Sequence, residues 1–280
     1  SAILSIIAKH RGIPIFHFEA GNRCFSDRGP EEINRSIVDT VADYNFCLTR
    51  YARDNLAAIG FPARRTFITG SHLPGVYKRA VPRIEKALQD LSLNKPFVLM
   101  SLHRAENLEN REVLSDLISN INKFAEHKGL AVIFLCHPRT EKKIRDWSIS
   151  LGGIDARHPV GFFEFASMCL KAQFIISDSG TIVEESSILR VPVIMLRDFH
   201  ERPEYNEVSW ISHISAKNID ANGLSRFQLY AETIEKRRIK LEEISESDIR
   251  ELSEISDFKR DCISDFLVFN LVQLIHNAQK

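Results

Sequence analysis

Short, continuous apolar runs alternate with helical segments along most of the chain, and this alternation limits the fold more than any other feature. The runs predict strands at 13–18, 44–48, 66–70, 97–102, 131–136, 174–177 and 193–196. Helices are predicted between them at 31–41, 51–59, 111–126, 140–147, 163–170 and 182–189. Continuous apolar strands that are separated by helices are typical of parallel strands buried on both faces. The sequence therefore predicts an α/β fold with doubly wound sheets.

One interruption of this pattern predicts a domain junction. Residues 72–96 include Pro74, Gly75 and Pro82, and in this stretch we expect a helix only at 84–91. Beyond residue 230 the chain becomes strongly charged and helical at 232–250, and it ends in a predicted amphipathic helix at 261–277. The first residues have the pattern of a helix already in progress, so we expect the chain to be the later portion of a longer protein.

Composition excludes several classes of protein. With 280 residues and 44% hydrophobic residues, the chain is long and apolar enough to bury a core, which argues against a disordered protein. The 37 basic residues balance the 37 acidic ones, which argues against nucleic acid as the main partner. Five scattered cysteines favour a reducing compartment, and we expect a cytoplasmic protein. No apolar run approaches the ~20 residues of a membrane helix, so no membrane partner is expected.

The segment after the strand at 174–177 is the strongest candidate for a binding site. The strand leads directly into Asp178-Ser179-Gly180-Thr181 and then into a helix, whose N-terminal amides favour an anion. Glu185 follows Thr181 by one helical turn, so its carboxylate is expected to reach back toward the same point. This combination suits a phosphate that is attached to a sugar with hydroxyl groups. The alternative is that Asp178 and Ser179 only cap the helix.

Polar residues also follow three other predicted strands. His103 and Arg104 come after the strand at 97–102, where they could neutralise a diphosphate, and surface charge is the alternative. Cys136-His137 follows the next strand, but adjacent ligands without a second pair do not make a zinc site, so no metal is predicted. Arg197, with Glu201 and Arg202, follows the strand at 193–196 and has the composition of a positioned charge network.

Acidic residues near the start form a further candidate. Glu19 comes at the end of the strand at 13–18, and Glu31 and Glu32 open the next helix. Acidic residues are also favourable at a helix N-terminus for its dipole alone, which is the simpler explanation for Glu32. Two carboxylates beside one cleft could act as an acid and a base if their pKa values differ.

Several of these strings together resemble the bacterial non-hydrolysing UDP-N-acetylglucosamine 2-epimerases and their UDP-sugar relatives. They occur in the family's order and cover most of residues 1–210. The matching strings are His17-Phe-Glu-Ala-Gly-Asn-Arg, Pro30-Glu-Glu-Ile-Asn-Arg, Phe67-Ile-Thr-Gly, His103-Arg, Ser177-Asp-Ser-Gly, Glu184-Glu, and Arg197 with Glu201-Arg-Pro-Glu.

The resemblance implies two Rossmann-like domains that face each other across a cleft, in the GT-B arrangement, with the first domain incomplete. It implies a remainder of the N-terminal domain at 1–74, a UDP-binding domain at 75–255 and a C-terminal helix at 256–280 that returns to the first domain. The family's first strand with its glycine-rich turn, an active-site arginine and an aspartate would precede Ser1. On this expectation, the segment alone would be inactive.

The resemblance also implies roles for individual residues. Glu19 and Glu31 resemble the catalytic carboxylates, and His103 resembles a histidine that is catalytic or contacts the diphosphate. Phe165 is similar to the residue that packs against uracil, although core packing is its alternative. The predicted substrate-binding set is Ser179, Gly180, Thr181, Glu185, Phe165, Arg197, His137, Arg104 and Glu106. Within this set, Arg104 and Glu106 resemble residues that contact a second, activating UDP-sugar in some members.

The expected reaction is the interconversion of UDP-GlcNAc and UDP-ManNAc without a cofactor, through elimination of UDP to a 2-acetamidoglycal and re-addition. Two departures concern the sugar and the activating site: Thr181 replaces a common second glycine, and Ala105 replaces an arginine. Other strings are more similar to the branch that makes UDP-N-acetyl-L-fucosamine, which is one alternative. A GT-B glycosyltransferase and a non-catalytic UDP-sugar-binding protein are the others. A homodimer is the family expectation.

Overall fold

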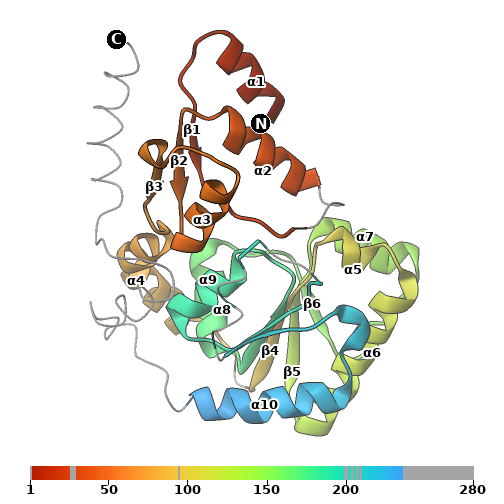
Figure 1. Cartoon of the computed structure of the whole chain (residues 1–280). Coiled ribbons are helices and arrows are strands. Elements are labelled where there is room, and N and C mark those ends of the chain that lie inside the picture. The colour runs from red at the N-terminus through yellow and green to blue at the C-terminus, as the bar shows by residue number, and fades with distance from the viewer. Residues whose placement is uncertain are drawn as a thin grey trace. The chain divides into compact units, whose positions relative to one another are not determined.

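The computed structural model describes residues 2–25, 30–93, 95–198, 201–202, 205, 208 and 210–235. The described chain divides into two compact units (Figure 1). The first contains residues up to Lys78 together with 201–202, and the second contains residues from Arg79 to Asp198 and the described residues from Tyr205 on. The helices predicted at 261–277 and beyond residue 235 lie outside the described residues.

The first unit is built on a three-stranded parallel sheet in the order β1-β2-β3. Rings from the three strands stack on one face, with centroid distances of 4.9 Å for Phe18–Phe46 and 5.6 Å for Phe46–Phe67. Bulky aromatic residues are favourable on such a pleated surface. The elements are α1 (Ala2–His10), β1 (Phe16–Phe18), α2 (Pro30–Val41), β2 (Tyr44–Cys47), α3 (Arg50–Ala58), η1 (Ala63–Arg65) and β3 (Thr66–Ile68).

The prediction of a helix only at 84–91 is wrong, because a single helix, α4 (Leu73–Asp90), covers most of residues 72–96. Pro74 is tolerated because the first turn of a helix has no N–H bonds to lose. Pro82 lies inside the helix, where proline ordinarily costs ~3 kcal/mol. The buried side chains of Tyr77, Ala80 and Ile84 recur along one helical face, and their burial offsets that cost. The boundary between the units falls within this helix, after Lys78.

The second unit is built on a six-stranded parallel sheet in the order β6-β5-β4-β7-β8-β9 (Figure 1). In chain order this is 3-2-1-4-5-6, the strand order of the Rossmann fold. The parallel sheets of both units confirm the predicted α/β class. The facing of two domains across a cleft stays a prediction. The strands are β4 (Phe97–Ser101), β5 (Ala131–Leu135), β6 (Asp155–Arg157), β7 (Phe174–Ser177), β8 (Val193–Met195) and β9 (Ile211–His213).

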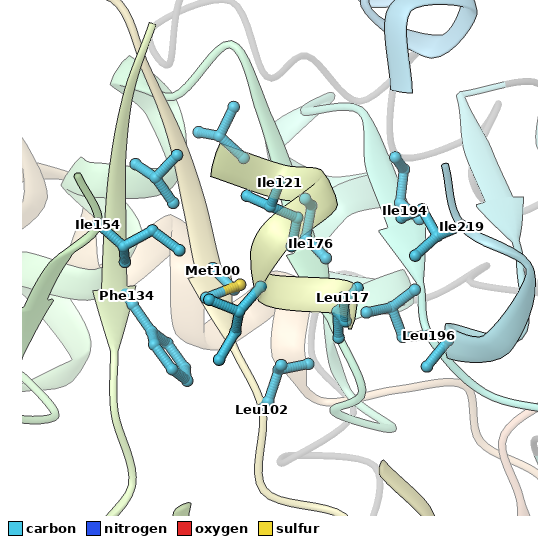
Figure 2. Close-up of a cluster of buried hydrophobic side chains, with 14 of the residues drawn as sticks. Met100, Leu102, Leu117, Ile121, Phe134, Ile154, Ile176, Ile194, Leu196 and Ile219 are labelled. Atoms are coloured by element: carbon cyan, nitrogen blue, oxygen red, sulfur yellow. The ribbon is translucent and has the colours of Figure 1, made fainter. Parts of the chain in front are cut away.

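Alternate residues of the central strands supply the main hydrophobic core. Met100, Phe134 and Ile176 of three strands belong to one cluster with Leu117 and Ile121 of α6 (Arg111–Lys128), and Figure 2 shows these residues among it. The intervening strand residues are also buried and point to the opposite face, since side chains alternate along a strand. The sheet is therefore buried on both faces, as its continuous apolar strands predicted.

The remaining helices connect these strands. The helix at 182–189 was predicted with both ends correct, and the helices at 111–126, 140–147 and 163–170 are confirmed with small shifts at their ends. No element was predicted at α5 (Ala105–Leu108), at strands β6 and β9, or at the 3-10 turns η1 and η3, and α10 (Ala221–Glu235) was predicted only from residue 232. The remaining elements are α5 (Ala105–Leu108), α7 (Pro138–Asp146), α8 (Phe162–Lys171), α9 (Ile182–Leu189), η3 (Ala216–Asn218) and α10 (Ala221–Glu235).

Candidate active site

The centre of the second sheet brings two of the predicted segments together. Strands β4 and β7 are neighbours, with Ser101 opposite Ser177 at their carboxyl ends. Successive connections leave this pair toward opposite edges of the sheet, which makes it the topological switch point where Rossmann folds bind ligands. His103 and Asp178, which are 75 residues apart in the sequence, meet at this point.

The carboxylate of Asp178 is the hub of this strand-end region. It is fully buried and accepts hydrogen bonds from the backbone N–H groups of His103 (3.0 Å) and Arg104 (2.9 Å). It also accepts one from the side-chain amide of Asn107 (3.0 Å). The Nδ1 atom of the His103 ring lies 3.1 Å from Oδ1 of Asp178. Burial alone would raise the pKa of Asp178. These hydrogen bonds outweigh that effect, so the pKa lies below its ordinary value and the carboxylate is held ionised.

The helix-cap alternative is wrong for Asp178. The cap residue of α9 is Thr181, and its side chain makes no capping hydrogen bond. The backbone of Thr181 has ordinary right-handed dihedral angles (φ −86°), so threonine is accommodated where the family commonly has glycine. Ser179 Oγ lies 3.2 Å from Thr181 Oγ1, and both precede the helix together with Gly180. Glu185 lies half-buried in the first turn, one turn after Thr181.

Two other predicted site residues, Arg197 and Glu106, form an ion pair with each other. Arg197, which follows β8, places Nε 3.6 Å from Oε1 of Glu106 in α5. Burial raises the pKa of Glu106, and Arg197 and Arg104 reduce that rise without cancelling it. Asn107 donates to the Leu196 carbonyl (2.9 Å) as well as to Asp178, so it joins the ends of β7 and β8.

His137 and Phe165 have structural contacts of their own. His137 caps α7, accepting a hydrogen bond at Nδ1 from the backbone N–H of Arg139 (3.2 Å). Its ring centroid lies 6.3 Å from that of His103. Phe165 lies half-buried in the first turn of α8. A cavity of about 160 Å³ near the ends of β5 and β6 is lined by Cys136, Glu141, Ile144, Leu151, Ala156, Arg157 and His158, so Phe165 does not line it.

Glu19, in the first unit, has a strained backbone. It directly follows β1 and has φ of +60°, in the left-handed region that residues other than glycine seldom adopt. Such strain costs on the order of 1–3 kcal/mol and is commonest at functional sites. Its carboxylate is about half exposed and lies 3.3 Å from the guanidinium of Arg202, which is buried in the same unit. The structure thus gives Arg202 an ionic partner from another segment, and the network of Arg197, Glu201 and Arg202 stays a prediction.

The loop after Glu19 is held by a buried carboxylate that the sequence did not reveal. Asp39 of α2 is fully buried and contacts Arg23 at 2.6 Å and Nδ1 of His17 at 2.7 Å. Its oxygens also accept from the backbone N–H of Gly21 at 3.3 Å. Asp39 lies near the C-terminal end of α2, between Val38 and Thr40, and a single acidic residue there has no local pattern that distinguishes it from a surface residue. Only the tertiary structure shows that it supports the loop.

Glu31 and Glu32 behave differently although they are adjacent. Glu31 is exposed at the start of α2. The carboxylate of Glu32 accepts hydrogen bonds from the backbone N–H of Cys24 (3.2 Å) and from the guanidinium of Arg35 (3.1 Å). Through Glu32 the loop that begins at Glu19 is attached to the first turn of α2. The structure thereby joins the segments that carry Glu19 and Glu31, within one unit.

Comparison with known proteins decides the family. Residues 1–236 match the sequence profile described as UDP-N-acetylglucosamine 2-epimerase. The chain belongs to the UDP-N-acetylglucosamine 2-epimerase family. A relative of that name from Methanocaldococcus jannaschii is 34% identical over 215 residues, which are 73% of this chain and 59% of the relative. The chain therefore spans a little over half the length of that relative.

Two further members extend the comparison. A UDP-2,3-diacetamido-2,3-dideoxy-D-glucuronate 2-epimerase from Pseudomonas aeruginosa is 33% identical over 69% of this chain and 54% of its own length. The crystal structure of the M. jannaschii UDP-GlcNAc 2-epimerase, in complex with UDP-GlcNAc and UDP, superposes with a TM-score of 0.74. It is 32% identical and covers 85% of this chain and 66% of its own. These likenesses confirm the sequence-based identification of the epimerase family.

Among the residues that the structure describes, no three His, Cys, Asp or Glu side chains are grouped so that they could hold a metal ion. No helix in that same part of the chain has the length and apolar character needed to cross a membrane.

Proposed function

We propose that this chain, as part of its complete polypeptide, epimerises a UDP-sugar at C2, with UDP-GlcNAc and UDP-ManNAc as the interconverted pair. The observation that carries the proposal is the meeting of His103, Asp178 and the Ser179–Gly180 turn at the switch point of a Rossmann sheet. It is supported by membership of a family whose named relatives include several UDP-N-acetylglucosamine 2-epimerases.

In this proposal the second unit binds the nucleotide diphosphate. The first turn of α9 supplies backbone amides and the positive end of the helix dipole. His103, Arg104 and Arg197 add donors for the charge that develops on the departing diphosphate. Glu185, half-buried one turn into the helix, is suited to accept hydrogen bonds from ribose hydroxyls.

The first unit supplies the acid–base groups. The hydrogen at C2 is not acidic, because no carbonyl group is adjacent, so its removal must be coupled to cleavage of the C1–O bond. A carboxylate takes the C2 proton, the C–H electron pair becomes the C1=C2 double bond, and UDP leaves with the C1–O pair. Re-addition of UDP at C1 with proton delivery to the opposite face of C2 gives the epimer. We propose Glu19 and Glu31 as the two groups, and the strain at Glu19 supports its assignment.

Deuterium exchange tests this assignment. In D₂O the proposed route introduces solvent deuterium at C2, which proton NMR detects as loss of the C2 signal. Glu19→Gln and Glu31→Gln in the complete polypeptide should each slow exchange at least ~100-fold, the usual scale of a lost acid or base. Glu112→Gln is the matched control, since Glu112 is likewise an exposed glutamate in the first turn of a helix. Exchange near the wild-type rate in both test variants would remove the two glutamates from the mechanism.

The sugar itself needs a direct comparison of substrates. The P. aeruginosa relative, with a different named sugar, is nearly as similar as the UDP-N-acetylglucosamine 2-epimerase of M. jannaschii. UDP-GlcNAc, UDP-N-acetyl-L-fucosamine and UDP-2,3-diacetamido-2,3-dideoxy-D-glucuronate should therefore be incubated with the enzyme, and inversion at C2 measured by NMR. We expect the highest kcat/KM with UDP-GlcNAc, and preference for another sugar would correct the substrate while keeping the reaction.

A glycosyltransferase would transfer the sugar to an acceptor without C2 exchange, and a UDP-sugar sensor would bind without either reaction. The same NMR experiment separates both from an epimerase. Activation by a second UDP-sugar at Arg104 and Glu106, a homodimeric assembly and a cytoplasmic location stay predictions.

A further inference from the structure

The buried carboxylate of Asp178 has all its hydrogen-bonding capacity directed at one segment. A carboxylate offers about four acceptor positions. Here they are taken by the backbone N–H groups of His103 and Arg104, the amide of Asn107 and the Nδ1 edge of the His103 ring. Asp178 makes these contacts from outside helix α9, and its own side chain is fully buried. Its contacts therefore organise the residues after β4.

The contact with the imidazole determines which ring nitrogen carries a proton. An ionised carboxylate only accepts hydrogen bonds, so Nδ1 of His103, 3.1 Å from Oδ1, must be the donor. The His103 side chain is 38% exposed whereas Asp178 is completely buried, so the ring is anchored on its inner edge and open elsewhere. Nε2 is then the ring nitrogen that Asp178 leaves for other partners.

We propose that Asp178 is a positioning residue that holds His103 in the Nδ1–H form and so directs Nε2 toward the substrate. The catalytic part of this inference rests on the proposed function, because it assumes that His103 meets the diphosphate. The part that concerns the proton does not, because it follows from the contact alone. In this proposal Asp178 acts on the reaction through His103 rather than by contact with the substrate.

A neighbouring histidine provides a comparison inside the same unit. Nδ1 of His137 accepts a hydrogen bond from the N–H of Arg139, so that nitrogen must lack a proton and Nε2 must carry it. The two rings are 6.3 Å apart and have opposite proton positions imposed by different backbone and side-chain partners. A general effect of the environment would favour the same protonated nitrogen in both rings. The different hydrogen-bond partner of each Nδ1 atom explains why they differ.

The simplest competing explanation is that Asp178 only joins strand ends. Asn107 binds both Asp178 and the carbonyl of Leu196, so removal of the carboxylate could loosen the ends of β7 and β8 in general. Thr140→Val is the matched control for that effect. Thr140 is fully buried at the same edge of the sheet and donates its hydroxyl hydrogen bond to the Leu102 carbonyl, without contact to Asp178.

The primary test is ¹⁵N NMR of selectively labelled histidine in the wild-type protein and in Asp178→Asn, Asn107→Ala and Thr140→Val. In the wild type, His103 should show the shifts of a ring protonated at Nδ1, and His137 those of a neutral ring protonated at Nε2. Asp178→Asn should abolish the Nδ1–H preference of His103, because its amide can present an N–H to that edge. Asn107→Ala and Thr140→Val should retain that preference. A wild-type His103 ring protonated only at Nε2 would overturn the proposal, even if no variant folded.

Kinetics then test the catalytic consequence. Asp178→Asn should lower kcat for C2 exchange by at least ~100-fold, as expected for a misplaced acid–base or charge-stabilising group, with KM changed less than about threefold. Thr140→Val should lose comparable stability in urea but little kcat. Equal kcat losses in both variants, with an unchanged His103 signal, would show that Asp178 is only structural. If the wild type epimerises no UDP-sugar but His103 has the expected signal, the proposed function fails and the Asp178–His103 relation stands.

Discussion

Gly21 is the position where a single added methyl group should test the structure most severely. Its φ is +78°, and a Cβ atom built there would lie 2.0 Å from the carbonyl oxygen of Ala52 and 2.8 Å from its carbonyl carbon. Real Cβ atoms essentially never approach other atoms more closely than 3.0 Å, so the loop or the start of α3 must move by about 1 Å. Gly60 is a matched control, since its φ is +80° but an added Cβ would meet nothing within 4 Å.

The two glycines therefore separate backbone strain from close approach. Gly60→Ala should cost only the left-handed conformation of alanine, ~1–2 kcal/mol. Gly21→Ala carries the same strain and also displaces two hydrogen bonds, from its N–H to the Asp39 carboxylate and from Asn55 to its carbonyl. A bond to a charged group contributes ~1.5–3 kcal/mol and a neutral one ~1 kcal/mol, so together with the backbone strain we expect a total of ~3.5–6 kcal/mol.

Urea unfolding followed by far-UV circular dichroism measures the cost, and hydrogen exchange of peptides from residues 16–25 locates it. Both tryptophans, Trp147 and Trp210, belong to the second unit, so the midpoint of their fluorescence change reports that unit and should stay the same in both variants. If Gly21→Ala and Gly60→Ala cost the same within ~0.5 kcal/mol, the close approach of Gly21 to α3 is refuted.

Three further results are expected. His137→Ala should lower the free energy of unfolding by ~1 kcal/mol through loss of the α7 cap, and His137→Asn by less, because asparagine is itself a good cap; equal losses would contradict the capping role. Burial raises the pKa of Cys136 from 9.0 to about 11, so stability should be unaffected below pH 9 and fall between pH 9 and 11. A Cys136→Ala variant should lack that part of the decline in alkaline urea titrations. Arg202→Met should lower kcat at least ~10-fold while calorimetric UDP affinity changes little, and Arg202→Lys should recover part of the loss; unchanged kcat would separate Arg202 from the Glu19 site.

The strands and longer helices could be predicted because their apolar patterns are strong. Phe174–Ser177 and Ile182–Leu189 have the predicted bounds, since an apolar strand and a well-packed helix are separated by a glycine turn. The exposed strand β6 (Asp155–Arg157) could not be predicted, because an edge strand with no buried residue has no apolar pattern. The first half of helix α4, before residue 84, was missed because Pro74, Gly75 and Pro82 argue locally against a helix, whereas burial along one helical face stabilises it.

The candidate site was only partly predictable for a similar reason. His103 and Arg104 were found because they directly follow a buried strand. Asp178, the partner that fixes them, was placed in the predicted anion-binding segment with helix capping as its alternative, but its bonds to residues 103–107 were not foreseen, because the adjacency of β4 and β7 is a property of the sheet order rather than of either segment. Asp39 was missed altogether. In both cases the missing information is which distant segments meet, and a single sequence does not contain it locally.

The pairing of β4 with β7 also has a consequence for how the protein folds. β4 is the first strand of the second unit and β7 is the fourth, so their pairing closes a long loop of chain. Such non-local parallel pairing slows folding. The hydrogen bonds from His103 to Asp178 span 75 residues, so they can form only once β4 and β7 have come together. Chains in which β4 and β7 have not yet paired should therefore be unable to bind the nucleotide, and recovery of binding during refolding would report when this pairing forms.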